Sequence, residues 1–266
     1  MSNIHVFIIS WRDQHNRAAQ IANNLSGRLN KIAIVYSGPD AEILDGLDCQ
    51  LIRRDDHLFW ADKFRACLDH CDPQDIMLVI HADCTCDDWG QLIDKCRQAH
   101  ARIEDLAVWS PKLRGTPWRL ERTRMRRIEG SECTIVAQTD GLVFALSPAI
   151  AERMRSADYS ENFYGLGIDW LFVCAAYARH QLAVVDESIL VHHALSRGYS
   201  SKEARAQKHV FLKTQLTPDE HAAYVWLKRQ MAPRKHYGKL LYRLECLKGW
   251  WTHLTTSRTT RSDGLC

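Results

Sequence analysis

The chain has 266 residues, of which 46% are hydrophobic and 25% are charged, and its formal net charge is +3. These proportions are typical of globular proteins and exclude a chain that is disordered over most of its length. The small net charge argues against a dedicated nucleic-acid-binding protein, which usually has a strongly basic surface. We therefore expect no nucleic-acid partner.

The apolar runs of the sequence are short. None approaches the roughly 18–20 residues that a membrane-spanning helix needs. The first run, at residues 4–9, has no basic flank before it and does not resemble a signal peptide. We therefore expect a cytoplasmic protein, and we interpret its ten cysteines as reduced thiols.

Strand and helix patterns alternate over the first two thirds of the chain. Short apolar runs predict strands at residues 6–10, 32–36, 49–52, 76–80, 106–110, 134–137, 142–146, 182–185 and 189–193, of which the first two are expected to be buried on both faces and 49–52 is the weaker third. Helical spacing and capping residues predict helices at residues 18–25, 59–70 and 170–179, and two more that begin near residues 87 and 147. This order implies an α/β, Rossmann-like fold, with a mixed, mostly parallel sheet flanked by helices.

The sequence after residue 200 is basic, helical and aromatic. It contains an apolar stripe at helical spacing, made of Leu240, Leu241, Leu244, Leu247, Trp250 and Trp251. The stripe either lies on an anionic membrane surface or packs on the preceding domain. We expect an α/β domain at residues 1–200, a basic helical extension at 201–254 and a disordered tail at 255–266.

Polar side chains follow the first four predicted strands, at the edge where open parallel sheets bind ligands. These residues are Ser10, Trp11 and Arg12 after the first strand, Asp40 after the second, Arg54 and Asp56 after the third, and His81 and Asp83 after the fourth. Together they suit a polar, partly anionic ligand.

The segment His81-Ala82-Asp83 has three interpretations. In the first, Asp83 binds a divalent cation that bridges two phosphates. In the second, His81, Cys84 and Cys86 bind zinc, although their spacing is unusual for zinc. In the third, residues 81–85 are the D-x-D-x-T motif of a haloacid-dehalogenase-like phosphatase. The first aspartate of that motif is the nucleophile, and His81 stands in its place, so such an enzyme would have no nucleophile.

A second group of candidate residues surrounds the start of the helix near residue 170. Gly165 and Gly167 allow a sharp turn or a close approach to a ligand. Asp169 lies in the first turn of that helix, where a carboxylate can act as a general base. Asp140 and Gly141, in a polar turn before a buried strand, are candidates to line the same site.

A third group follows the last predicted strand. His192 and His193 end this strand, and Arg197 follows in a glycine-containing loop. Neutral imidazole is a common metal ligand, and the guanidinium of arginine binds phosphate with two hydrogen bonds.

In order and spacing, these motifs resemble GT-A fold glycosyltransferases, in particular family-2-like enzymes of the nucleotide-diphospho-sugar transferase superfamily. The resemblance covers roughly residues 4–200, which would then be the GT-A catalytic domain. It implies that Asp83, with His192 or His193, holds Mg²⁺ or Mn²⁺ against the donor diphosphate. His81 stands where the family motif has its first acid. The resemblance further implies that Asp169 is the catalytic base of an inverting transfer.

The same resemblance assigns the remaining residues to donor and acceptor. The donor side would comprise Ser10, Trp11, Arg12, Asp40, Arg54, Asp56, His81, Asp83 and Arg197. The acceptor side would comprise Trp118, Asp140, Gly141, Gly165 and Gly167. The implied reaction moves a sugar from a nucleotide-diphospho-sugar to a hydroxyl of a glycan or lipid-linked saccharide, in surface polysaccharide or lipopolysaccharide synthesis.

Two alternatives remain open from the sequence. One is a non-catalytic nucleotide- or carbohydrate-binding protein with a decayed transferase fold, for which His81 is the main argument. The other is a nucleotidyltransferase, although the N-terminal region has no glycine-rich phosphate loop. The arginine-rich segment 114–127 is either a mobile acceptor-side loop or a solvated charged loop.

Overall fold

The structure is a computed structural model, and it describes residues 3–39, 41–116, 118–193 and 201–234. Ten strands of these residues form one sheet, in the order β3-β2-β1-β4-β9-β6-β10-β8-β7, with β5 paired to β10. The strands are β1 (Ile4–Ser10), β2 (Ile32–Tyr36), β3 (Gln50–Arg53), β4 (Ile76–His81), β5 (Cys84–Cys86), β6 (Leu106–Arg114), β7 (Arg124–Arg127), β8 (Cys133–Val136), β9 (Val143–Leu146) and β10 (Leu182–His193).

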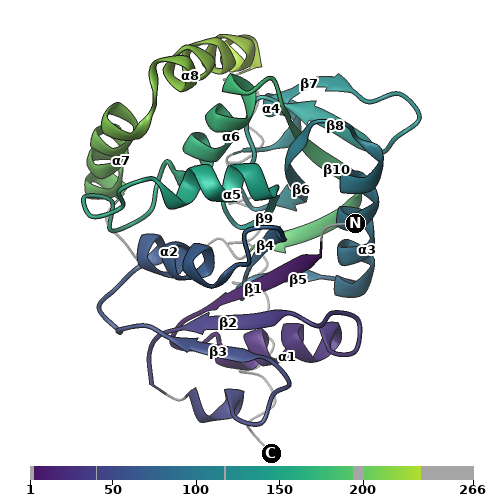
Figure 1. Cartoon of the computed structure of the whole chain (residues 1–266), viewed down its shortest axis with the longest axis vertical. Coiled ribbons are helices and arrows are strands. Elements are labelled where there is room, and N and C mark those ends of the chain that lie inside the picture. The colour runs from purple at the N-terminus through teal and green to yellow at the C-terminus, as the bar shows by residue number, and fades with distance from the viewer. Residues whose placement is uncertain (1–2, 40, 117, 194–200, 235–266) are drawn as a thin grey trace, which may run out of the picture.

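The sheet is mixed. β3, β2, β1 and β4 are parallel neighbours, as are β6 and β10, whereas β9 runs antiparallel between β4 and β6. The helices are α1 (His15–Leu25), α2 (Trp60–His70), α3 (Trp89–Arg102), α4 (Leu120–Thr123), α5 (Pro148–Arg155), α6 (Ile168–Ala178), α7 (Ser201–Gln215) and α8 (Pro218–Met231), with short 3₁₀ helices η1 (Ala41–Leu44) and η2 (Ala232–Arg234). The expected α/β fold, a sheet flanked by helices, is confirmed (Figure 1).

Each face of the sheet has its own hydrophobic core. Alternate residues of β1 point to opposite faces, as in any strand. Val6 and Ile8 pack with α1 and α3 on one face, and Phe7 and Ile9 pack with α2, α5 and α6 on the other. Burial on both faces explains why β1, β2 and β4 are mostly apolar, whereas β3, at the edge of the sheet, is mostly exposed.

The last strand differs from its expectation. The two runs predicted as separate strands at 182–185 and 189–193 form the single strand β10. Its pairing with β6 shifts register between Asp186 and Leu190, and such an irregularity lets a strand bend without ending. β10 also pairs with β5 and β8. β10 therefore connects β5, which follows β4, to β8, the neighbour of β7 in the arginine-rich segment.

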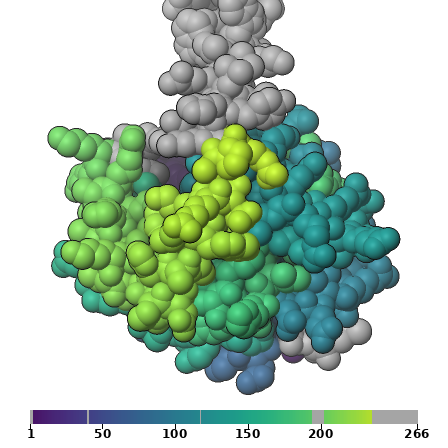
Figure 2. Space-filling model, turned by 90° about the horizontal axis from the view of Figure 1, so that it is seen from above, coloured from purple at the N-terminus to yellow at the C-terminus, as the bar shows by residue number. Residues whose placement is uncertain are grey.

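Helices α7 and α8 lie outside α5 and α6, and they form a continuous part of the face shown in Figure 2. Phe211 and Leu212 of α7 and Leu227 and Met231 of α8 belong to the same core as α6. The domain boundary expected at residue 200 stays a prediction. The apolar stripe at 240–251 and the tail 255–266 lie outside the described residues.

None of the helices in the described ranges is long and apolar enough to cross a membrane. Eight of the ten cysteines lie in the described ranges, and all eight are free thiols.

Candidate functional site

Asp83 and His193 form a pair at the carboxyl ends of β4 and β10. Residues Cys84 and His193 are partners in the β5–β10 ladder, which brings the preceding Asp83 against the imidazole. Nε2 of His193 lies 3.0 Å from Oδ2 of Asp83, and Nδ1 lies 3.4 Å from the carbonyl oxygen of Gly115. An imidazolium ring can donate to both oxygens.

The pair favours its charged form. Burial alone would raise the pKa of Asp83, but the hydrogen bond and charge of His193 lower it overall. Burial likewise disfavours the imidazolium, yet the contacts with Asp83 raise the pKa of His193. His192 is different: its side chain is exposed, and neighbouring residues of a strand point to opposite sides. Of the two candidate histidines, only His193 faces Asp83.

His81 lies in an aromatic environment. The centroid of its ring is 4.5 Å from that of Trp60 and 6.1 Å from that of Trp11. Its Nε2 is buried and has no hydrogen-bond partner among the described residues. Burial lowers the pKa of His81 to about 4, so the ring is neutral at pH 7. A neutral imidazole therefore stands where the family motif has an acid.

The donor set at Asp83 fits a divalent cation in part. Within the described ranges, no three His, Cys, Asp or Glu side chains group as a metal site, so His81, Cys84 and Cys86 form no zinc site. Asp83 and His193 offer one carboxylate oxygen and one imidazole nitrogen. This pair suits Mn²⁺ better than Mg²⁺, which prefers oxygen ligands throughout. A bound diphosphate and water would have to supply the other ligands.

Asp169 lies in the first turn of α6, directly after a turn built from glycine. Gly167 has φ +98° and Gly165 has φ +71°, both in the left-handed region that favours glycine. Nε2 of Gln138 donates a hydrogen bond of 2.8 Å to Oδ2 of Asp169. This bond fixes the orientation of the carboxylate, whose Oδ1 has no hydrogen-bond partner among the residues that the structure describes.

Asp140 is a second carboxylate next to Asp169. The hydroxyl of Thr116 donates a hydrogen bond to it. Burial and the negative charge of Asp169 raise the pKa of Asp140 to about 6. The adjacent Gly141 lies against Asp169, because a methyl group added to it would be 3.8 Å from Cβ of Asp169. The turn at 138–141 and the start of α6 therefore form one side of the site.

The strand ends of β1, β2 and β3 also meet. The backbone of Gly38 lies against Arg12, and its N–H donates a hydrogen bond of 2.6 Å to Oδ1 of Asp56. Arg54 forms a two-bond ion pair with Asp62. Their ligand roles stay predictions.

The remaining residues expected on the donor side are Ser10, Trp11, Asp40 and Arg197. Ser10 is buried, and its hydroxyl lies 2.8 Å from Nδ1 of His15, so its role in donor binding stays a prediction. Trp11 is partly buried beside His81. Asp40 and Arg197 lie outside the described residues.

Trp118, which the sequence assigns to the acceptor side, packs edge to face on Trp170, with ring centroids 5.6 Å apart. Two cations face these rings: Arg122 lies 4.6 Å from the centroid of Trp118, and Lys208 lies 5.6 Å from that of Trp170. Lys208 belongs to α7, outside the part of the chain expected to form the site. Its sequence position gave no signal, because only the packing of α7 brings it to Asp169.

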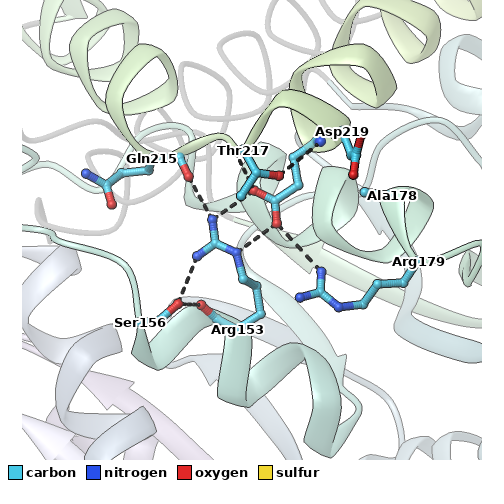
Figure 3. Close-up of a pocket in the computed structure, with 8 residues that line it drawn as sticks. Arg153, Ser156, Ala178, Arg179, Gln215, Thr217 and Asp219 are labelled. Atoms are coloured by element: carbon cyan, nitrogen blue, oxygen red, sulfur yellow. Dashed lines mark hydrogen bonds and ion pairs between the residues drawn. The ribbon is translucent and has the colours of Figure 1, made fainter.

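A separate pocket lies between α5, α6 and α8. Its lining residues are Arg153, Ser156, Ala178, Arg179, Gln215, Thr217, Asp219 and Glu220. Arg153 makes two hydrogen bonds of 2.7 and 2.8 Å to the carboxylate of Glu220, and Arg179 lies 3.6 Å from it (Figure 3). The residues assigned to the site from the sequence do not line this pocket. Its ion pair joins α8 to α5.

Comparison with known proteins shows the fold alone. No protein-family model and no curated protein matches the sequence. A crystal structure of GalNAc-T7 with UDP, GalNAc and Mn²⁺ is similar, with a TM-score of 0.60 and 9% identity. The match covers 86% of this chain and 57% of that one, so this chain spans little more than half its length.

A structure of UDP-glucose pyrophosphorylase complexed with UDP-glucose matches more loosely. Its TM-score is 0.47 at 10% identity, and the match covers 79% of this chain and 99% of that chain. The likeness to GalNAc-T7 confirms the GT-A fold expected from the sequence. Membership of the nucleotide-diphospho-sugar transferase superfamily, and of family 2 within it, stays a prediction.

Proposed function

We propose that the protein is a glycosyltransferase that moves a sugar from a nucleotide-diphospho-sugar to a hydroxyl group of a glycan or lipid-linked saccharide. One observation supports it most. Asp83 and His193 pair at the carboxyl ends of β4 and β10, and Asp169 and Gln138 pair at the start of α6. Asp140 lies close enough to both sets for the charges of Asp169 and His193 to act on it. The first set suits a diphosphate and its cation, and the second suits a hydroxyl that must lose a proton.

In this proposal Asp169 is the general base of an inverting displacement. It removes the proton of the acceptor hydroxyl while that oxygen attacks the anomeric carbon. The bond between this carbon and the diphosphate oxygen breaks, and its electron pair leaves with the nucleoside diphosphate. Gln138 holds one carboxylate oxygen at 2.8 Å, so the base is oriented before the substrate arrives.

At the other end of the site, Asp83 and His193 would hold the donor diphosphate through Mn²⁺. When bound, the cation would neutralise charge that develops on the leaving diphosphate. To bind the cation through a ring nitrogen, His193 would have to be neutral, so binding of the cation would displace the proton that its contacts with Asp83 favour. The proposal that Mn²⁺ is preferred follows from the mixed nitrogen and oxygen donors.

The test is donor turnover by the full-length chain. UDP-, GDP-, CMP- and dTDP-sugars are supplied with Mn²⁺, with Mg²⁺ or with EDTA, and release of nucleotide is measured. We expect hydrolysis of one donor class, faster with Mn²⁺ than with Mg²⁺ and lost in EDTA. Binding without turnover would favour the non-catalytic alternative, and release of pyrophosphate from a nucleoside triphosphate and a sugar phosphate would favour a nucleotidyltransferase.

The base assignment needs its own variant. Asp169→Asn keeps the shape and the acceptor oxygen but cannot take a proton. We expect transfer to fall by about 10²–10⁴-fold, the usual contribution of a general base, with donor affinity unchanged. The matched control is Asp94→Asn, an exposed residue of α3. Transfer at a near wild-type rate in Asp169→Asn would contradict the assignment.

A further inference from the structure

Lys208 of α7 lies over aromatic rings at the start of α6. Its Nζ is 5.6 Å from the ring centroid of Trp170 and 5.9 Å from that of Trp118. A methyl group added to Gly167 would lie 3.1 Å from Cγ of Lys208, so the side chain crosses directly over the turn that leads to Asp169. An ammonium over the faces of tryptophan rings is a favourable cation–π arrangement.

This ammonium has no carboxylate partner. Among the described residues, no carboxylate oxygen lies within ion-pair distance of its Nζ. Asp169 is the acid whose charge acts on Lys208, while Lys228 and Arg122 add positive charge. Burial is the larger effect and lowers the pKa of Lys208. A partly desolvated cation of this kind is stabilised by an anion that arrives with a ligand.

The surroundings reinforce the positive charge. Lys228 lies 5.0 Å from the ring centroid of Tyr224, which in turn packs edge to face on Trp170 at 4.7 Å. Arg122 lies 4.6 Å from the centroid of Trp118. Three cations therefore surround the side of the site where Asp169 supplies the charged carboxylate.

Its neighbours assign Lys208 to the acceptor and not to the donor. The side chain of Lys208 lies against Gly167, and its Nζ lies over the rings of Trp118 and Trp170. Gly167 and Trp118 are residues that the proposed function assigns to the acceptor. His193 instead contacts Asp83, at the end of the site proposed for the diphosphate.

We propose that Lys208 selects an acceptor saccharide that carries a negative group, a carboxylate or a phosphate, and pairs with that group while Asp169 faces the reacting hydroxyl. The inference rests on the proposed function and adds the charge class of its acceptor. Trp118 and Trp170 would act as positioning residues that hold the ammonium in place.

The test compares sugars that differ only in charge. Methyl β-D-glucuronide and methyl β-D-glucoside are titrated at constant ionic strength, and binding is followed by saturation-transfer NMR. A second pair, glucose 6-phosphate and glucose, distinguishes phosphate from carboxylate. We expect the wild type to bind one charged sugar about fivefold more tightly than its neutral partner, the size expected of a single ion pair.

Variants at position 208 locate the effect. Lys208→Met should abolish the preference and leave affinity for the neutral sugar within about twofold, whereas Lys208→Arg should keep it. Lys213→Met, an exposed residue of the same helix, is the control and should behave as the wild type. Equal binding of both sugars by the wild type, or a preference that survives in Lys208→Met, would overturn the proposal.

Failure of this inference is distinguishable from failure of the proposed function. Donor binding is measured in parallel with the four nucleotide sugars. If the protein binds a nucleotide sugar but does not prefer the charged sugar over the neutral one, the proposed function stands and only the charged acceptor is ruled out. A charge preference in a protein that binds no donor overturns the transferase and, with it, the acceptor role of Lys208.

Discussion

At the scale of single residues, the charge of Asp140 lowers the stability of the folded protein. Its carboxyl group is held beside Asp169, and burial with that charge raises its pKa to about 6. The pKa in the unfolded chain is near 3.8. Between these values the folded protein binds a proton that the unfolded chain has lost, so stability falls as the pH rises from about 4 to about 6. At pH 7 this destabilisation is complete.

Removing the charge of Asp140 should therefore stabilise the protein. We expect Asp140→Asn to raise the free energy of unfolding at pH 7 by about 1–2 kcal/mol, after discounting for solvent and for the coupling to Asp169. The gain should shrink as the pH is lowered from 7 to 5. Urea unfolding at each pH measures it, with the exposed Asp45→Asn as control. A gain that does not depend on pH would show that the charge is not its cause.

The types of the site residues were predictable, but their partners were not. Asp83 and Asp169 stand out because each follows a clear pattern, an apolar strand in one case and a glycine turn in the other. Gln138 and Thr116 are ordinary polar residues until the fold brings them to Asp169 and Asp140. The choice between His192 and His193 depends on the orientation of one strand, which the pattern of residues 189–193 does not fix.

At the scale of elements, the turn at 165–167 connects the two ends of the site. Gly165 has φ +71°, and a methyl group on it would lie 2.2 Å from Cδ1 of Trp60. Trp60 in turn packs on His81. Trp60, the first residue of α2, can therefore pack against the turn before α6 only because residue 165 is a glycine and has no side chain.

Gly165→Ala should disturb this fit. We expect a loss of about 2–4 kcal/mol in unfolding free energy, from the left-handed backbone and from displacement of the indole ring. Gly130→Ala is a close control, since Gly130 has φ +67° and a methyl group there would meet no atom within 4 Å. It should cost only about 1–2 kcal/mol. The free energies of unfolding are measured with urea. Equal losses in the two variants would mean that the ring of Trp60 can move aside at no cost in stability.

Long apolar elements were predictable from the sequence, and short ones were not. The strand expected at 76–80 is β4 and the helix expected at 59–70 is α2, each within one residue at its ends. β5 has three residues and α4 has four, too few to show any period. Their formation depends on neighbours far along the chain, and β5 is the element that aligns Asp83 with His193.

At the scale of the whole molecule, one buried ion pair ties the C-terminal helices to the sheet domain. The side chains of Arg153 and Glu220 are 10% and 2% exposed. Glu220 also accepts a hydrogen bond from the backbone of Thr217, in a capping box that starts α8. The same carboxylate therefore begins the helix and anchors it. α7, which carries Lys208, ends beside this ion pair, because the carbonyl oxygen of its last residue, Gln215, accepts a hydrogen bond from Arg153.

Breaking the pair should loosen α8 without unfolding the sheet. Glu220→Gln keeps the capping hydrogen bond but leaves Arg153 buried without a countercharge, and we expect a loss of about 3 kcal/mol. Hydrogen exchange should show faster exchange in α8 than in β4. Glu152→Gln, which removes an exposed ion pair with Arg155, should cost less than about 1 kcal/mol. Unchanged exchange in α8 would show that apolar packing alone holds the helix.

The position of β10 in the sheet also determines when the site can form. β10 is the last of the ten strands that the structure describes, yet it lies between β6 and β8. Gln138 meets Asp169 across 31 residues, whereas His193 meets Asp83 across 110, a loop that costs about 1 kcal/mol more entropy to close. During synthesis the proposed base Asp169 can thus be in place while the proposed diphosphate site at Asp83 and His193 is still incomplete. We expect the chain to acquire donor affinity only when its final strand inserts.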